Sequence, residues 1–201
     1  MWLIILTNAA TIAASGAIPP LVELLGEGSS AEVQEAAAGA LANLAHDSDH
    51  QVAIAAAGAV PPLVQLLGPG TTADVQQLAV GALGTLAQNA DNQVAIAAAG
   101  AIPLLVQLLG AGSTAAVQRS AARELSNLAQ NADNQVTITD ACAIPPLVQL
   151  LRPGSDDLPN EFAAAALQAL GYGSDENFTA IVTCGASAGV DVLEEMARLC
   201  M

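Results

Sequence analysis

A period of 42 residues constrains the fold of this chain more than any other feature. The string Gly-Ala-Ile-Pro-Pro-Leu-Val at residues 16–22 returns, with one change each time, at residues 58–64, 100–106 and 142–148. Leucine recurs at fixed offsets within this period, as at Leu41, Leu83, Leu125 and Leu167. A repeat of this length indicates stacked helical units, each of which buries its apolar face against its neighbours.

Each period predicts three helices. In the second unit, a short helix over residues 51–57 ends at Gly58, a second helix begins at Pro61, and a longer third helix follows the threonine pair 71–72. Glycine suits the left-handed residue after a helix, and proline suits the first helical turn. Threonine is a good N-cap, since its hydroxyl accepts a hydrogen bond from the first turn. We therefore expect an all-α fold.

The pattern divides the chain into four repeats between two partial ones, within one continuous solenoid domain. The predicted units are a partial N-terminal repeat or cap over residues 1–15, repeats over 16–57, 58–99, 100–141 and 142–184, and a partial C-terminal repeat or cap over 185–201. Residues 1–6 are apolar but lack a positive flank and are too short to span a membrane. We interpret them as the edge of a packed helix, and as an end through which two copies could associate.

The composition fits close helix packing and excludes several functions. Of the 201 residues, 45 are alanine and only 2% are aromatic, which favours helices packed at short range. Lys and Arg number 4 against 19 acidic residues, a net charge of −15, and the four bases are all arginine. Such a chain is a poor partner for nucleic acid or an anionic membrane. Without lysine it has neither a phosphate-loop lysine nor a Schiff-base lysine.

The three cysteines, Cys142, Cys184 and Cys200, form no Cys-x-x-Cys pair. An odd number of unpaired cysteines fits a reducing compartment better than a secreted disulfide scaffold. We therefore expect an intracellular protein, cytoplasmic or nuclear.

The order of these features resembles the armadillo repeat. The matching elements are a short helix, then Gly-Ala-Ile-Pro-Pro-Leu-Val-x-Leu-Leu, a glycine-rich turn and Val-Gln-x-x-Ala-x-x-x-Leu-x-Asn-Leu-Ala. The repeats are most similar to those of plant-type U-box ubiquitin ligases and of vacuolar protein 8. The resemblance implies an armadillo-type α-solenoid, a right-handed superhelix of three-helix repeats. It also implies a non-catalytic scaffold that binds an extended peptide in the concave groove formed by the third helices. The alternative is a substrate-recruiting or tethering fragment of a larger protein of the U-box or vacuolar protein 8 type.

The resemblance also implies which side chains would meet such a peptide. In armadillo proteins an asparagine near the end of the third helix hydrogen-bonds the peptide backbone, and this position matches Asn43 and Asn127 here, with Thr85 and Ala169 in the other two repeats. An amide can donate and accept at once, which suits a peptide bond. The competing interpretation is that Asn43 and Asn127 cap their own helices.

Four residues earlier, importin-α repeats carry a tryptophan that stacks on a nuclear-localisation peptide. The matching residues here are Gly39, Gly81, Arg123 and Ala165. Since the tryptophan array is absent, we do not expect a nuclear-import adaptor.

Arg119 and Arg123 are four residues apart and share one helix face. Guanidinium groups bind carboxylates and phosphates bidentately. We expect a ligand with an acidic or phosphorylated residue near the third repeat. The competing interpretation is that the arginines pair within the protein, with Glu124 or with Glu35.

Two sequence matches to catalytic or metal sites are weak, and we expect no catalytic residue, metal or cofactor. Residues 185–189 fit the Gly-x-Ser-x-Gly nucleophile elbow, but the chain has no later histidine to act as base. We interpret them as an inter-helix turn. His46 and His50 could ligate a metal, but later repeats have Gln88 and Asn92 there, so we interpret this segment as a solvated turn.

Overall fold

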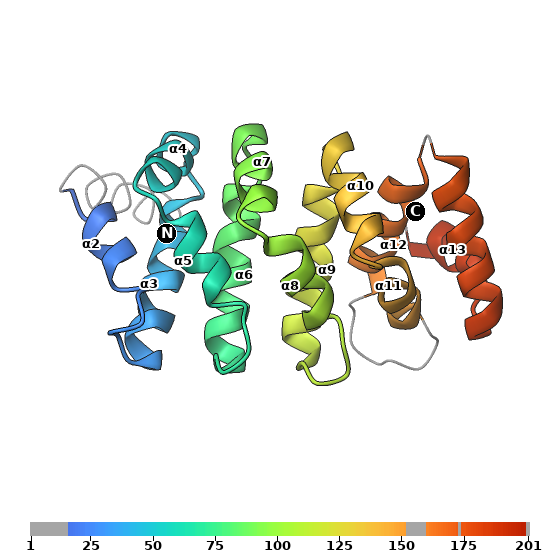
Figure 1. Cartoon of the computed structure of the whole chain (residues 1–201), viewed down its shortest axis with the longest axis horizontal. Helices are drawn as coiled ribbons and strands as arrows, with labels where there is room; N and C mark the ends of the chain where they lie inside the picture. Colours follow the sequence, from blue (N-terminus) through green and yellow to red (C-terminus); the bar gives the residue numbers. More distant parts are fainter. Residues whose placement is uncertain (1–15, 152–159, 173, 200–201) are drawn as a thin grey trace. The chain divides into compact units, whose positions relative to one another are not determined.

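The computed structural model describes residues 16–151, 160–172 and 174–199, and these residues form α-helices with no strand (Figure 1). The chain separates into two compact units, residues 1–99 and 100–201. The predicted partial repeat over residues 1–15, with its apolar start, lies outside the described residues.

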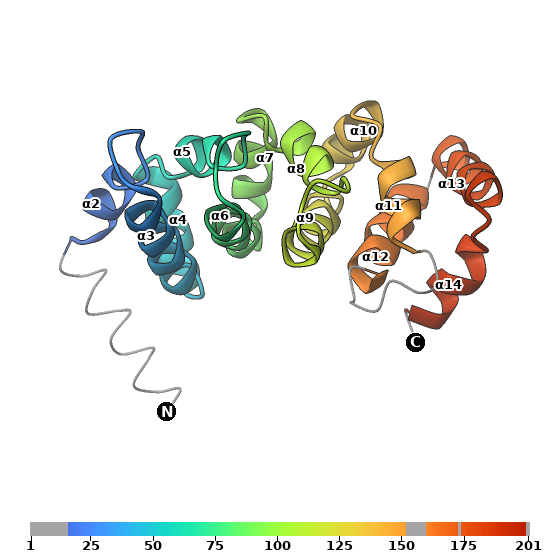
Figure 2. The same cartoon turned by 90° about the horizontal axis from the view of Figure 1, so that it is seen from below.

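In the first unit, the long helices α3 and α6 lie side by side, and the shorter helices pack against them (Figures 1 and 2). The helices are α2 (Ile18–Glu23), α3 (Ala31–Leu44), α4 (Ser48–Ala56), α5 (Val60–Gln65), α6 (Ala73–Leu86) and α7 (Ala90–Ala98).

The second unit continues the same helix order. Its helices are α8 (Ala101–Leu108), α9 (Ala115–Leu128), α10 (Ala132–Asp140), α11 (Ile144–Leu150), α12 (Asn160–Gly171), α13 (Asp175–Ala188) and α14 (Val192–Leu199). Helix α9 packs along α12, and α12 also contacts α13 and α14 (Figure 2). The alternation of short, short and long helices confirms the three helices that each period predicts.

Hydroxyl N-caps begin α3, α6 and α9, and Thr72 belongs to the threonine pair that predicts the start of α6. Ser30, Thr72 and Thr114 each accept a hydrogen bond from the backbone amide three residues later, at 3.3 to 3.4 Å. These hydroxyls satisfy an amide that has no partner inside the helix. Proline lies in the first turn of α2, α5 and α11, as expected from its fixed φ.

The core of both units is aliphatic. The recurring leucines Leu41, Leu83, Leu125 and Leu167 are fully buried, as are Ile54, Ile96 and Ile138 of the short first helices. Alanines fill the space between them, so adjacent helices approach closely, as the composition predicts.

The interpretation as a solvated turn is correct for His46, which is exposed in the turn between α3 and α4, but wrong for His50. His50 belongs to α4, and its Nδ1 atom lies 3.2 Å from the carbonyl oxygen of Leu44 at the end of α3. The equivalent residues Asn92 and Asn134 are buried and donate to the last carbonyl of the preceding long helix, at 3.0 and 3.2 Å. The last carbonyl groups of a helix lack hydrogen-bond partners within that helix. The polar side chain at this repeat position supplies one, and so links the short first helix to the end of the preceding long helix.

Residues 185–189 do not form a turn as a whole, and this prediction was also wrong. Helix α13 continues through Gly185 to Ala188, and only Gly189 adopts the left-handed conformation that ends it. Gly185 is buried, and an added Cβ would overlap Val192 Cγ2. The missing side chain lets the start of α14 pack closely against α13.

Cys142 occupies the repeat position of Gly58 and Gly100. Those glycines have φ of +80° and +82°, and Cys142, at φ 59°, is the only non-glycine residue with positive φ among those described. A β-carbon in this conformation costs about 1–2 kcal/mol.

We therefore expect Cys142→Gly to raise the free energy of unfolding by about 1 kcal/mol in urea titrations under reducing conditions. The matched control is Cys142→Ala, which removes the thiol but keeps the β-carbon. Equal stabilisation by both variants would contradict backbone strain as the cause.

No single helix in the described part of the chain is long and apolar enough to cross a membrane. Only the bent pair α7 and α8 meets the length and composition criteria together.

Candidate functional site

The predicted site residues lie on the long helices. Asn43 is on α3, Thr85 on α6, and Arg119, Arg123 and Asn127 are on α9. The three residues of α9 are spaced four apart and therefore share one face of that helix. Arg123 is exposed, whereas Arg119 and Asn127 are half-buried.

The two asparagines have different surroundings. Asn43 is exposed and makes no side-chain hydrogen bond within the described structure, so it does not cap α3. The side chain of Asn127 donates from Nδ2 to Glu124 Oε2 at 3.3 Å. Asn43 can therefore offer its whole amide to a ligand.

Thr85 offers less to a ligand than the sequence pattern implies. Its side chain is buried, at 7% exposure, and its hydroxyl donates to the Gly81 carbonyl oxygen at 3.0 Å. This bond inside α6 uses the hydroxyl proton, so the peptide contact expected of Thr85 has no structural support here.

The arginines of α9 do not form the intramolecular ion pairs that the sequence left open. Among the described residues, the ion pair present is Arg198 with Glu195, at 2.6 Å on α14. The Nε atom of Arg119 is buried without a hydrogen-bond partner. Both guanidinium groups on α9 thus keep hydrogen-bonding capacity.

Glu124 is a buried carboxyl group that the sequence analysis treated only as a partner for arginine. It is 1% exposed, and its Oε1 atom has no hydrogen-bond partner. Burial raises its pKa to about 8, although the hydrogen bond from Asn127 and the charge of Arg123 oppose the rise. The signal available in the sequence is that the other repeats have alanine here, at Ala40, Ala82 and Ala166.

A hollow of about 400 Å³ lies between α9, α10 and α12. Its lining includes Ala165 and Ala169, the fourth-repeat residues at the tryptophan and asparagine positions, together with Ser126, Gln130 and Tyr172. Tyr172 is 85% exposed. Small side chains on α12 therefore leave room beside an exposed aromatic ring.

In the first unit, too, small residues occupy the position that matches the importin-α tryptophan. A Cβ at Gly39 would lie 3.6 Å from Leu78 Cδ1, whereas one at Gly81 would meet nothing within 4 Å. At this position, α6 is thus open at Gly81, whereas α9 bears the charge of Arg123.

The Gly-x-Ser-x-Gly motif at residues 185–189 does not adopt the geometry of a nucleophile elbow. Ser187, the serine of the elbow motif, lies within α13 and donates to the Thr183 carbonyl oxygen at 2.9 Å, whereas the elbow requires a turn after a strand. The described part of the chain contains no group of three or more His, Cys, Asp and Glu side chains that could hold a metal ion.

The helix order and the faces described above define a helical repeat protein. A family model for the armadillo/beta-catenin-like repeat matches residues 8–46, 47–88 and 89–130, more than half of the chain. The chain belongs to the armadillo repeat family, as the sequence motifs predict.

Solved structures of engineered proteins, among them designed armadillo repeat proteins, are similar along nearly the whole chain. A crystal structure of an engineered protein is 32% identical, with a TM-score of 0.84, and the match covers 96% of this chain and 83% of that one. A designed armadillo repeat protein in complex with the peptide (KR)4 is 28% identical, with a TM-score of 0.82 and coverage of 96% and 84%. The comparison with curated proteins gave no match. The fold is therefore all-α and of the armadillo type.

Proposed function

We propose that this protein is a non-catalytic scaffold that binds an extended peptide of a partner protein along its long helices. The observation that carries the proposal is the face of α9, where Arg119 and Arg123 lie in line with Asn127 and form no ion pair with any residue that the structure describes. The hollow between α9 and α12 supports it, since a peptide side chain could enter beside Tyr172. The designed relative that holds the peptide (KR)4 shows that such a fold can accept a peptide.

The arginines favour a ligand that differs in charge from (KR)4. A carboxylate or phosphate group can receive two parallel hydrogen bonds from one guanidinium group. Phosphate, with more charge and more acceptor oxygens than a carboxylate, suits two adjacent arginines best. The proposed ligand therefore has a phosphorylated or acidic residue that contacts α9.

The proposal is tested with fluorescein-labelled ten-residue peptides that differ only at a central phosphoserine, glutamate or serine. We expect affinity to fall in that order by fluorescence anisotropy. The Arg119→Ala/Arg123→Ala double variant should weaken binding of the phosphoserine peptide at least tenfold, because each lost charge-assisted hydrogen bond is worth about 1.5–3 kcal/mol.

The control is Arg198→Ala, which removes the same charge from α14, where Arg198 already pairs with Glu195. The acidic ligand would be refuted if the wild-type protein bound all three peptides with equal affinity. It would also be refuted if the double variant bound the phosphoserine peptide as tightly as the wild-type protein does.

The second proposal, a recruiting or tethering fragment of a larger U-box or vacuolar protein 8 type protein, depends on sequence resemblance alone. An intracellular location and self-association through residues 1–6 likewise stay predictions.

A further inference from the structure

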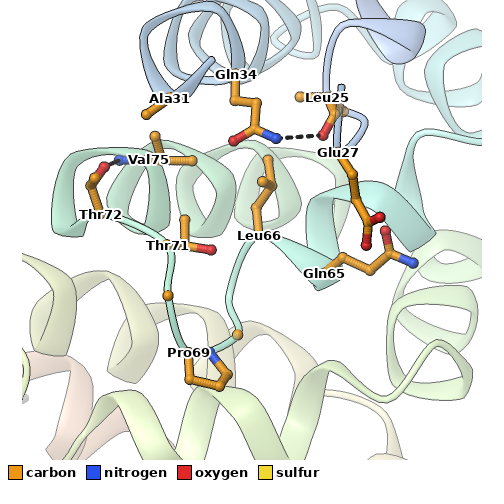
Figure 3. A pocket seen from close by; sticks show the side chains of 12 residues that line it. Leu25, Glu27, Ala31, Gln34, Gln65, Leu66, Pro69, Thr71, Thr72 and Val75 are labelled. Carbon is orange, nitrogen blue, oxygen red and sulfur yellow. Dashed lines mark hydrogen bonds between the residues drawn. The ribbon is translucent and has the colours of Figure 1, made fainter. Parts of the chain in front are cut away.

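A separate pocket of about 460 Å³ lies in the first unit, between the turn that follows α2 and the turn that joins α5 to α6 (Figure 3). Its apolar lining residues are Leu25, Ala31, Leu66, Pro69 and Val75, of which Ala31 and Pro69 are not buried. Five polar side chains also line it: Glu27, Gln34, Gln65, Thr71 and Thr72. None of these belongs to the predicted peptide face.

The turns give this pocket a defined backbone frame. Gly70 has φ +94°, which favours glycine, and a Cβ at Gly68 would approach the Gln65 carbonyl oxygen to 3.1 Å. On the other side, Gln34 donates from Nε2 to the carbonyl oxygens of Leu25 and Gly26, at 3.2 and 3.0 Å (Figure 3). The cavity therefore depends on hydrogen-bonded backbone as well as on surface side chains.

The charged side chains in this part of the sequence are all negative. Residues 16–99 contain no Lys or Arg and eight carboxylates, which are Glu23, Glu27, Glu32, Glu35, Asp47, Asp49, Asp74 and Asp91. Glu27 is the charged residue of the lining and is exposed. Asp74 lies in the first turn of α6 and offsets the positive end of that helix. An anionic ligand would therefore meet repulsion, whereas a cation meets no competing base in this part of the chain.

We propose that this pocket binds a lysine or arginine side chain of a partner protein. The methylene stem of such a side chain packs against Ala31 and Pro69, the apolar lining residues that are not buried, while its charged head reaches the Glu27 carboxylate. Figure 3 shows the Glu27 side chain directed toward that of Gln65, whose amide oxygen is a second acceptor for the bound cation. The apolar wall suits the methylene stem of a long basic side chain, and the acidic mouth suits its cationic head.

The test is a titration of ¹⁵N-labelled protein with Nα-acetyl-arginine amide, followed by amide chemical shifts. We expect the amides of Ala31, Thr71 and Val75 to shift together. Nα-acetyl-leucine amide, which lacks the charge, should bind at least fivefold more weakly. Glu27→Gln should weaken binding of the arginine derivative at least fivefold, and so should 0.5 M NaCl, because it screens an exposed ion pair.

Two further variants separate the pocket from general attraction to an acidic protein. Glu23→Gln removes an equally exposed carboxylate outside the lining and should leave affinity unchanged. Ala31→Leu keeps the charge but fills part of the cavity, and should also abolish the shifts. Equal loss in Glu23→Gln and Glu27→Gln, or undiminished binding to Ala31→Leu, would overturn the proposal. None of these variants touches α9, so binding of the phosphoserine peptide tests the proposed function separately.

Discussion

Replacing the buried Glu124 by alanine is expected to stabilise the protein, by an amount that grows with pH. Glu124 is 1% exposed, and burial raises its pKa to about 8 from the ordinary value of 4.5. Between these values the folded protein keeps a proton on this carboxyl group that the unfolded chain releases. The unfolded state then binds fewer protons, so this residue makes the free energy of unfolding fall by about 1.4 kcal/mol per pH unit.

The alanine variant lacks this pH-dependent loss. Below about pH 4.5 both states of the wild-type protein are protonated at Glu124, so the substitution should change stability little there. Near pH 8 and above, it should raise the free energy of unfolding by several kcal/mol. Alanine already occupies the equivalent positions Ala40, Ala82 and Ala166, so the backbone geometry suits it.

The measurement is urea denaturation of wild-type and variant protein at pH 5, 7 and 9. Glu124→Gln, which keeps the shape and the acceptor for Asn127, should remove the same pH dependence. Glu23→Ala, at an exposed carboxylate, is the control for lost negative charge. A stability difference between wild type and Glu124→Ala that stays constant from pH 5 to pH 9 would contradict the raised pKa.

A single methyl group at Gly185 is expected to destabilise the C-terminal helices. A Cβ there would overlap Val192 Cγ2 and lie 3.0 Å from the Val190 carbonyl oxygen. Val192 is 3% exposed, so it has little room to move away. Overpacking of this kind costs about 1–3 kcal/mol, against a gain of up to about 1 kcal/mol from alanine's better helix propensity.

The measurement for Gly185→Ala is thermal unfolding by circular dichroism, together with amide exchange in α13 and α14. Gly81→Ala is the matched control, because Gly81 is also inside a helix but its Cβ would meet nothing within 4 Å. It should therefore stabilise the protein by about 1 kcal/mol. Val192→Ala in the Gly185→Ala background should restore part of the loss, and strictly additive effects would show that the two residues do not clash.

The family, the helix order and the aliphatic core could be predicted from the sequence because each depends on local chain chemistry repeated at a fixed period. Proline in a first turn, a hydroxyl before a long helix and leucine at a constant offset act through their own backbone and nearest turn. Because the same leucine offset recurs in four repeats, an exception in one repeat does not hide the pattern. The pattern predicts that Leu41, Leu83, Leu125 and Leu167 are buried, and all four are.

The sequence alone could locate the predicted site residues on the long helices. It could not tell which of their side chains a ligand can reach. Asn43 and Thr85 hold equivalent positions, yet Asn43 is exposed while Thr85 is buried and bonded to Gly81. Position in a repeat determines on which helix face a residue lies, but the packing around that face determines how much of the side chain a ligand can reach.

The sequence by itself thus determined the repeat, its three helices and the armadillo family. Only the tertiary structure decided that Glu124 is buried, that α13 continues through Gly185, and that a pocket with an acidic mouth lies beside Glu27. The physical reason is that these features depend on distances between segments remote in sequence. Burial raises a pKa, and a missing side chain admits a neighbouring helix, only when another element lies close by.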